Sequence, residues 1–376
     1  MCAIPVARWD PTEAEPGRAA GESTVEVESP EPLSPIGEGF SLAQFTGLEN
    51  DPRLLQNKWD TSETDPMTKV LCIALNPTID VSCDAERVQS MHKTRTTNQR
   101  QDPGGGGVNV ARVISELGGD PELTYLSGGA TGILLDAFLA ETGIALRSFP
   151  ISKPVRMAFA VHEETSGIEY RFVPEGPEVA SSELQPIIDL LGETDADYVV
   201  ASGSLPRGVP EDTYAKMIVP VVQRGGRFVI DTSGPALKAA LDHGNVFLFK
   251  PSLGELQKLA GRPLDEDGVR KFAKEMVDKG AAENVTVTLG TKGALLVNKD
   301  TVLRVPARHV AAKSAVGAGD SFVGALVWSL TEGHPMEEAF RLGVAAGAAT
   351  ALTSGTELCR RTDVLSLYEA EKVERL

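Results

Sequence analysis

The chain has 376 residues, of which 41% are hydrophobic and 24% are charged, a balance typical of ordinary globular proteins. Its formal net charge of −17 argues against general binding to nucleic acid or to anionic membranes, since both need a basic surface. The four cysteines form no CxxC pair, which argues against a zinc site or a disulfide framework and favours a cytoplasmic compartment. No apolar run is long enough to predict a membrane span, and no secretory signal is evident.

Residues 1–66 differ from the rest of the chain. They carry 13 acidic residues against 4 lysines and arginines, and Pro, Glu, Ser and Gly dominate. This composition buries too little apolar surface to offset the entropy cost of ordering, so we expect a disordered acidic extension. A short apolar patch at residues 40–45 would dock on the domain or on a partner; the alternative is a mobile tail with no specific role. We expect the folded domain to span residues 67–376.

From Lys69 onward, short apolar runs alternate with amphipathic segments. Residues 70–75 predict a buried strand that ends at Asn76-Pro77. Similar runs predict further strands at residues 198–201, 228–230, 246–249 and 285–289. Helical spacing predicts helices at residues 108–117, 212–223 and 267–279. Strands that alternate with helices indicate an α/β fold with a parallel sheet covered on both faces.

Two segments break this alternation. Residues 94–101 and 156–173 have the alternating polar and apolar side chains of strands, with no helix between the strands. In the second segment, two such runs flank a turn at residues 164–167, which predicts a hairpin. We expect a small separate sheet that acts as a lid or a subunit contact, with lid segments at about 76–103 and 156–173.

Four consecutive glycines, Gly104 to Gly107, precede the first predicted helix. Such a run costs substantial conformational entropy, which makes sense where a ligand lies against bare backbone. Asn109, one turn into the helix, offers both a donor and an acceptor to a ligand hydroxyl. The alternative is a flexible hinge before the helix. No GxxxxGK[ST] motif is present, so a Walker-type phosphate loop is absent from the sequence.

Polar or glycine-rich segments follow five of the predicted strands. In an open parallel sheet, ligands bind outside the carboxyl ends of the strands, so these segments predict a crevice there. The five segments begin at Asp80, Gly203, Asp231, Lys250 and Gly290.

The stretch AVGAGDS, residues 315–321, comes directly before an apolar run that predicts a buried helix. Free N–H groups and the positive end of the helix dipole make such a helix start a site for a phosphate or a developing anion. Asp320 would take a proton from an attacking hydroxyl there, as phosphoryl transfer requires. The alternative is that Asp320 is only an N-cap and the glycines only make a turn.

The glycine run with its helix, at residues 104–112, and the motif at residues 315–321 resemble the two signatures of the ribokinase-like (PfkB) family of carbohydrate kinases. The resemblance covers about residues 69–371. It implies a ribokinase-like three-layer α/β/α core with Rossmann-like topology and a small β-sheet lid. Lid sheets of this kind commonly pair subunits, so the resemblance also implies a homodimer.

The resemblance implies roles for individual residues. Asp320 would be the general base, and Gly317, Ala318 and Gly319 would form the anion hole. The sugar would be held by Asp80, Gly105, Gly106, Asn109 and Ser204. The sugar phosphate would be bound by Lys93 and Arg156, with Arg95 a less well aligned candidate. The nucleotide site would be lined by Lys250, Thr288, Gly290 and Gly293.

Two cations are implied in the same way. Glu255 would hold Mg²⁺ through water, because Mg²⁺ keeps much of its hydration shell. A monovalent cation, K⁺, would be bound beside the anion hole by Ser314, Val316, Thr350, Thr353 and Gly355. Two residues depart from the family pattern: Ser252 stands where Asn is usual, and Ala315 stands where Thr is common. Neither touches the core chemistry, so we expect an active enzyme.

Further motifs, among them NPTID at residues 76–80 and YRFV at residues 170–173, narrow the expected activity. They imply transfer of the γ-phosphoryl group of ATP to the C1 hydroxyl of fructose 6-phosphate. Tagatose-6-phosphate kinase or 1-phosphofructokinase activity is the alternative within the same chemistry. A non-catalytic sugar-phosphate sensor is the alternative from another class, and the intact Asp320 and Gly317 disfavour it. A nucleoside kinase is disfavoured by Lys93 and Arg156, which suit a phosphate-bearing substrate.

Overall fold

The structure of the protein is a computed structural model that describes residues 68–308, 310–369 and 373–376. The acidic extension predicted at residues 1–66, with its apolar patch, lies outside the described residues. Within the described ranges, none of the helices combines the length and the apolar character needed to cross a bilayer.

The strands, in chain order, are β1 (Val70–Ala74), β2 (Thr78–Ala85), β3 (Thr97–Gly104), β4 (Pro121–Ser127), β5 (Ala145–Pro150), β6 (Arg156–Glu163), β7 (Glu169–Phe172), β8 (Tyr198–Ser202), β9 (Arg227–Asp231), β10 (Val246–Phe249), β11 (Ala282–Thr288), β12 (Ala294–Val297), β13 (Val302–Val305) and β14 (Glu374–Arg375). The α-helices are α2 (Gly106–Glu116), α3 (Gly129–Ala140), α4 (Ser181–Glu193), α5 (Thr213–Gln223), α6 (Gly234–His243), α7 (Leu253–Ala260), α8 (Glu266–Asp278), α9 (Ala318–Thr331), α10 (Met336–Ala351) and α11 (Arg361–Glu369). A short 3₁₀ helix spans Gly290–Lys292.

The main sheet has the strand order β14-β13-β12-β11-β10-β9-β8-β1-β4-β5. Its strands run parallel from β11 through to β5, as the alternation of strands and helices predicts. The other edge differs from the expected all-parallel sheet, because β12, β13 and β14 pair antiparallel. Only five residues separate β11 from β12, and a parallel crossover needs a dozen or more, so the chain must reverse there.

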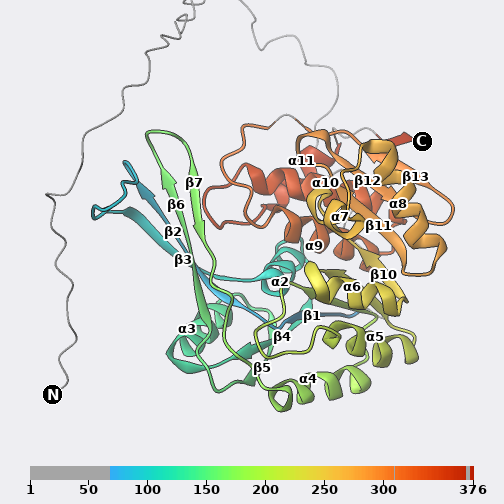
Figure 1. The fold of residues 1–376 in the computed structure, drawn as a ribbon, viewed down its shortest axis with the longest axis horizontal. Coiled ribbons are helices and arrows are strands. Elements are labelled where there is room, and N and C mark those ends of the chain that lie inside the picture. The colour runs from blue at the N-terminus through green and yellow to red at the C-terminus, as the bar shows by residue number, and fades with distance from the viewer. Residues whose placement is uncertain (1–67, 309, 370–372) are drawn as a thin grey trace, which may run out of the picture. The chain divides into compact units, whose positions relative to one another are not determined.

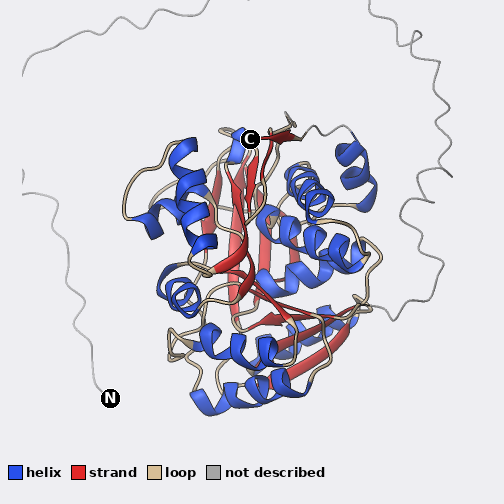
Figure 2. Cartoon of the chain, turned by 90° about the vertical axis from the view of Figure 1, so that its right-hand side faces the viewer, coloured by secondary structure: helices blue, strands red, loops and turns tan. Residues whose placement is uncertain are grey.

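Helices cover both faces of the main sheet (Figure 2). Side chains alternate along the central strand β1, and every residue of that strand is buried. Cys72 packs into the cluster beneath α2, α9, α10 and α11, whereas Leu71 and Ile73 pack into the cluster beneath α4 to α8. This two-sided burial yields the three-layer α/β core that the sequence predicts.

A second sheet stands beside the main one, in the strand order β3-β2-β6-β7 (Figure 1). Strands β6 and β7 form the antiparallel hairpin predicted from the sequence. Strand β3 lies three residues further along the chain than its predicted start and runs to Gly104. Strand β2 was not predicted. Its residue Asp80 therefore lies within a strand of the small sheet rather than in a loop after β1, because the chain resumes extended structure directly after Asn76-Pro77.

Candidate active site

Asp320 lies in the first turn of α9, whose N-cap is Gly317. Gly317 has φ 74°, in the left-handed region that favours glycine, and this turn exposes the first N–H groups of the helix. Two neighbours orient the partly buried carboxylate. The amide of Asn109, from α2, donates to Oδ2 at 2.9 Å, and the hydroxyl of Ser202, at the end of β8, donates to Oδ1 at 3.4 Å. The AVGAGDS motif and the glycine-run helix therefore meet at one carboxylate.

The charges around Asp320 explain its acidity. The pKa of Asp320 is raised to about 7, chiefly by burial and then by the neighbouring Asp231 carboxylate, against opposing effects from Asn109, Lys250 and Ser202. Lys250 Nζ lies 3.2 Å from Asp231 Oδ2, and this ion pair is almost completely buried. A carboxylate with a pKa close to neutrality can both accept and release a proton at physiological pH, which suits a general base.

Gly319 brings the backbone of α9 close to Lys250. A Cβ atom at Gly319 would lie 3.1 Å from Lys250 Nζ and 3.9 Å from Asp231 Oδ2. The buried ammonium thus stands beside the N-terminal turn of α9, where Ala318 is the first helical residue. A negatively charged group bound at this turn would meet both the helix N–H groups and a cation.

The glycine run has a structural reason at each end. A Cβ at Gly104 would overlap the carboxylate of Asp80, and a Cβ at Gly107 would overlap the backbone of Ile73 in β1. Gly105 is the N-cap of α2, and Gly106 is its first residue and packs against Ser202. Close contacts with neighbouring side chains and backbone, rather than a hinge, therefore account for the run.

Asp80 lies in β2 among cationic side chains. Its pKa is raised to about 6, chiefly by burial and slightly by Asp102, while Arg156, Arg171 and Arg112 act in the opposite direction. Arg156 donates to the carbonyl groups of Asn76 and Pro174, at 2.9 Å in each case. This end of the crevice therefore holds a carboxylate next to several guanidinium groups.

Ser204 lies near the same end, because Asn76 Nδ2 donates to its hydroxyl at 3.1 Å. Two buried atoms here, Asn76 Oδ1 and Arg156 Nε, have no hydrogen-bond partner within the part of the chain that the structure describes. Buried polar groups are seldom left without partners, so these atoms are candidates for contacts with a polar ligand.

Lys93 and Arg95 are not brought together with these residues within one chain. Both are exposed and lie in the connection between β2 and β3, at the end of the small sheet away from Asp80 (Figure 1). Their predicted contact with the sugar phosphate remains a prediction, and within a single chain the geometry does not favour it.

The predicted nucleotide residues gather at the carboxyl ends of β10 and β11. Lys250 follows β10, Thr288 ends β11, and Gly290 and Gly293 flank the short 3₁₀ helix beyond it. Ser252 is joined to Thr288 by an isolated parallel bridge. Ser252 also caps α7, since it forms a capping box with Glu255, whose Oε2 accepts from the Ser252 N–H at 2.8 Å. Serine is a favoured N-cap, so the departure at this position has a local structural role.

The five residues predicted to bind a monovalent cation come from two segments that lie side by side, since Lys313 N donates to Ala351 O at 2.7 Å. Three of their hydroxyls already have partners in the protein. Ser314 donates to Glu169 at 3.1 Å, Thr350 to Ser321 at 2.7 Å, and Thr353 to the carbonyl groups of Thr350 and Glu357. A cation here would therefore rely chiefly on backbone oxygens, including those of Val316 and Gly355.

The structure places Ser202, Asp231 and Arg171 at this site, and the sequence analysis assigned none of them an individual role. It did name Asp231 as the start of a crevice segment, and Arg171 as part of the YRFV motif. Arg171 and Asp80 line one narrow cavity together with Ala158 and Ala160 of β6. The alternation of β7 was the available signal, because it puts Arg171 on the same face as Glu169. The contacts of Ser202 and Asp231 depend on the packing of α9 against the strand ends, which no local pattern specifies.

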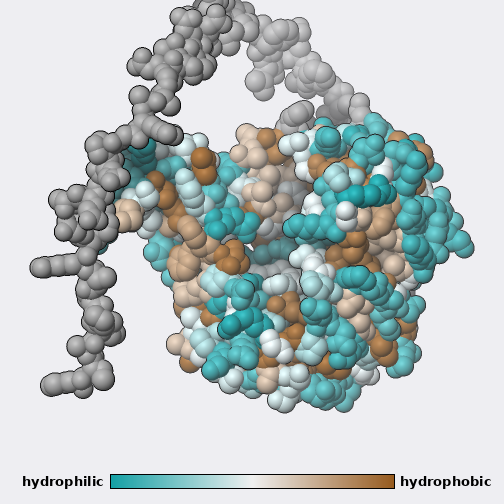
Figure 3. All heavy atoms as spheres, in the orientation of Figure 1, coloured by the Kyte–Doolittle hydropathy of each residue, from teal (hydrophilic) through white to brown (hydrophobic). Residues whose placement is uncertain are grey.

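The space-filling view shows a hollow between the small sheet and the main body (Figure 3).

The fold and the site together define an α/β protein with a carboxylate of raised pKa at a helix N-terminus. The model of the pfkB family carbohydrate kinases matches residues 67–363. ATP-dependent 6-phosphofructokinase isozyme 2 of Escherichia coli is 38% identical over 304 residues, which cover 80% of this chain and 98% of that protein. The 1-phosphofructokinase of Bacillus subtilis is 30% identical over 82% of this chain and 100% of that protein.

Among solved structures, phosphofructokinase-2 of Escherichia coli in complex with potassium is similar, with a TM-score of 0.78 and 38% identity over 81% of this chain and 99% of that one. The chain belongs to the PfkB family of carbohydrate kinases. Its ribokinase-like fold agrees with the expectation from the two sequence signatures.

Proposed function

We propose that this enzyme transfers the γ-phosphoryl group of ATP to the C1 hydroxyl of fructose 6-phosphate, giving fructose 1,6-bisphosphate. The observation that carries the proposal is Asp320, a base with a pKa of about 7 at the N-terminus of α9, beside the buried Lys250. The 38% identity to a 6-phosphofructokinase over most of both chains supports the choice of substrate.

In this proposal Asp320 removes the proton from the sugar hydroxyl while Asn109 and Ser202 hold its carboxylate in place. The N–H groups of Gly317, Ala318 and Gly319 and the ammonium of Lys250 offset the negative charge on the phosphoryl group in flight. Each group is fixed before the substrate arrives, so little reorganisation is needed during the reaction.

The sugar end is assigned to Asp80, Gly105, Gly106 and Ser204, with Arg156 as a ligand of the sugar phosphate. The Nε of Arg156 has no hydrogen-bond partner among the described residues, which supports this role, and we add Arg171 because it lines the same cavity as Asp80. Guanidinium groups bind phosphate with directional hydrogen bonds. Contact of Lys93 with this phosphate would require a second copy of the chain, as the loop of Lys93 lies at the far end of the small sheet.

ATP-dependent kinases of this family imply a divalent cation, which we propose to be Mg²⁺ held through water by Glu255. A carboxylate is a suitable oxygen donor, and one oxygen of Glu255 already serves the capping box with Ser252. No cluster of three or more Asp, Glu, His or Cys that could hold a metal occurs within the described ranges, which agrees with an ion bound largely by water and nucleotide. When bound, the ion neutralises phosphate charge. We further propose K⁺ beside the anion hole, which is supported by the complex of the similar Escherichia coli phosphofructokinase-2 with potassium.

The substitution Asp320→Asn tests the proposed base. The variant should bind both substrates with similar affinity yet lose about 10²–10⁴ in kcat, because the amide cannot accept the proton. Ser202→Ala serves as a control that keeps the base and should lose much less. Turnover of Asp320→Asn close to the native rate would contradict the assignment.

A panel of fructose 6-phosphate, fructose 1-phosphate and tagatose 6-phosphate tests the substrate, with kcat/KM from coupled ADP release as the measure. The highest value is expected for fructose 6-phosphate. Thermal stabilisation by a sugar phosphate without any ATP turnover would instead indicate a sensor.

We place the enzyme in the cytoplasm, a proposal that the free thiols of Cys72, Cys83 and Cys359 support.

We also propose a homodimer that pairs through the small sheet. Phe159 and Phe172 form a cross-strand pair there, and their side chains are 42% and 58% exposed. Large exposed apolar groups side by side on a sheet are typical of protein contacts. A tetrameric inhibited form has been described for phosphofructokinase-2 of Escherichia coli, which is 37% identical (TM-score 0.76).

A further inference from the structure

A chain of two hydrogen bonds joins the small sheet to the turn that begins α9. The Ser314 hydroxyl donates to Glu169 Oε2 at 3.1 Å, and the Val316 N–H donates to the same hydroxyl at 3.2 Å. Glu169 is the first residue of β7, whereas Val316 directly precedes Gly317, the N-cap of α9. The small sheet therefore has a polar contact with the backbone of the proposed anion hole.

The chemistry of the three groups fixes the direction of these hydrogen bonds. An ionised carboxylate only accepts, so the Ser314 hydroxyl must turn its single proton toward Glu169, and its lone pairs remain for the Val316 N–H. Ser314 and Val316 are both buried, so water is a poor substitute for either partner. Without the carboxylate the hydroxyl would be free to rotate, and the Val316 N–H would lose its fixed acceptor.

The turn needs such an anchor because small residues make it flexible. Gly317 has φ 74°, and glycine crosses between backbone conformations more readily than any other residue. The peptide group between Val316 and Gly317 is planar, so an anchored Val316 limits the rotation of the next N–H group. N–H groups stabilise a phosphoryl group best when they are oriented before the reaction. Glu169 thus contributes to that orientation through Ser314.

Strand β7 also carries a group at the sugar end. Arg171 lies two residues after Glu169, so the two side chains share a face of the strand. Arg171 lines one narrow cavity with Asp80 and with Val316 itself. A sugar phosphate bound by Arg171 would therefore hold in place the strand that presents Glu169 to Ser314.

We propose that Glu169 is a positioning residue that, through Ser314, couples binding of the sugar phosphate to the order of the N–H groups at the start of α9. This inference rests on the proposed function, because the sugar phosphate and the nucleotide are the two ligands that it couples. Glu169 itself touches neither of them. With the sugar site filled, β7 is held against the turn and the phosphoryl site is fully formed.

Linked binding measurements test the coupling. The dissociation constant of AMP-PNP, a non-hydrolysable ATP analogue, is measured by calorimetry with Mg²⁺, with and without saturating fructose 6-phosphate. In the native enzyme the sugar phosphate should tighten binding of the analogue by at least about fivefold. Glu169→Ala and Ser314→Ala should each bring this factor close to one, with native affinity for the analogue alone, and the double variant should do no more than either. Glu169→Gln keeps an acceptor and should retain most of the factor.

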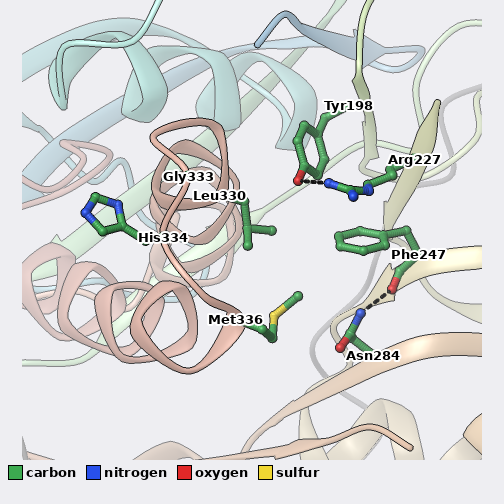
Figure 4. Close-up of a pocket in the computed structure, with 8 residues that line it drawn as sticks. All are labelled: Tyr198, Arg227, Phe247, Asn284, Leu330, Gly333, His334 and Met336. Carbon is green, nitrogen blue, oxygen red and sulfur yellow. Dashed lines mark hydrogen bonds between the residues drawn. The ribbon is translucent and has the colours of Figure 1, made fainter. Parts of the chain in front are cut away.

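Two control variants separate the coupling from general damage. Glu164→Ala removes an exposed carboxylate from the turn of the same hairpin. Tyr198→Phe removes a hydroxyl that accepts from Arg227 in a pocket of about 380 Å³ (Figure 4). Tyr198 and Arg227 are the first residues of β8 and β9, at the opposite strand ends from the Asp320 site. Both variants should keep the native factor.

The outcomes separate this proposal from the proposed function. A factor that survives Glu169→Ala, that falls as far in Glu169→Gln, or that falls in the controls would overturn the coupling, as would a native enzyme without any. Failure of fructose 6-phosphate to bind would instead contradict the proposed substrate. The factor would then be measured with whichever sugar phosphate of the panel binds, and the same outcomes would decide.

Discussion

At the scale of single residues, the raised pKa that suits Asp320 to act as a base also lowers the stability of the folded protein. Its carboxyl has a pKa of about 3.9 in an unfolded chain and about 7 in the fold. The folded state therefore binds the proton more tightly, and ionised Asp320 destabilises the fold above pH 7. This cost declines as the pH falls toward 4, where the group is protonated in both states.

Asp320→Asn should accordingly be more stable than the native enzyme, by on the order of 2–4 kcal/mol at pH 8. The difference should narrow as the pH is lowered to 5. Urea unfolding at both pH values measures it, with Asp300→Asn, on an exposed turn, as the control. A gain that is the same at both pH values would show that ionisation of Asp320 is not its source.

Gly104 is a second residue whose identity follows from a contact. Its missing side chain leaves room for the Asp80 carboxylate. Gly104→Ala should therefore displace Asp80 and raise the KM for the sugar phosphate by roughly 10–100-fold, an effect of about 1.4–2.8 kcal/mol. The matched variant Gly192→Ala, in α4 with open space around it, should leave the KM unchanged. A normal KM for Gly104→Ala would remove Asp80 from the sugar site.

At the scale of elements, the small sheet is fastened to the loop after α10. The Thr356 hydroxyl donates to Asp102 Oδ2 at 2.8 Å, and Arg100 bridges Asp102 and Glu357 at 2.9 Å in each case. Strand β3 is thereby tied to the segment that also carries the predicted cation ligands Thr353 and Gly355. A movement of the small sheet would therefore displace the segment that carries Thr353 and Gly355.

Thr356→Val tests the strength of this tie. The buried Asp102 carboxylate would lose a hydrogen bond, so the free energy of unfolding should fall by about 1–3 kcal/mol. Thr97→Val, exposed on β3, should change the free energy of unfolding by less than about 0.5 kcal/mol. Urea unfolding measures both variants. Equal losses in the free energy of unfolding for Thr356→Val and Thr97→Val would show that the contact between Thr356 and Asp102 is incidental.

The elements differ in how well the sequence predicts them. Helices α2 and α9 could be placed to within two residues because glycines mark their starts. The strands β1, β8, β9, β10 and β11 could be predicted because they are continuous apolar runs. Strands β4 and β5 of the parallel core were not predicted. Strand β2 was missed because its pairing with β3 and β6 depends on segments distant in sequence. The antiparallel edge was missed because only its short connection, and no side-chain pattern, requires the reversal.

At the scale of the molecule, the AVGAGDS motif and the glycine run pointed to Asp320 and Asn109 as site residues, but not to their contact with each other or to Ser202. They could not predict the Asp231–Lys250 ion pair, because it depends on how two separate strand ends are positioned under α9. They also could not place Lys93, whose predicted partner is distant within one chain. In a dimer, Lys93 of one copy would be able to reach the sugar-phosphate site of the other copy.

Phe172→Asp tests the proposed dimer. A charge in the exposed apolar face of the small sheet should convert a dimer to a monomer in sedimentation analysis, because it would be desolvated at the interface. Ile133→Asp, on α3 and 73% exposed, should remain dimeric. A dimeric Phe172→Asp, or a monomeric Ile133→Asp, would exclude pairing through this face.

The pairing within the small sheet also constrains the order of events during synthesis. Thr78 of β2 lies parallel to Arg156 of β6, and the whole of α2, β4, α3 and β5 is made between them. Until β6 leaves the ribosome, β2 and β3 form at most a two-stranded hairpin, which is marginally stable in water. The small sheet is therefore expected to mature only after the first parallel strands have assembled. A slow step in translation before β6 would prolong the time for which the edge of β2 stays open to other chains.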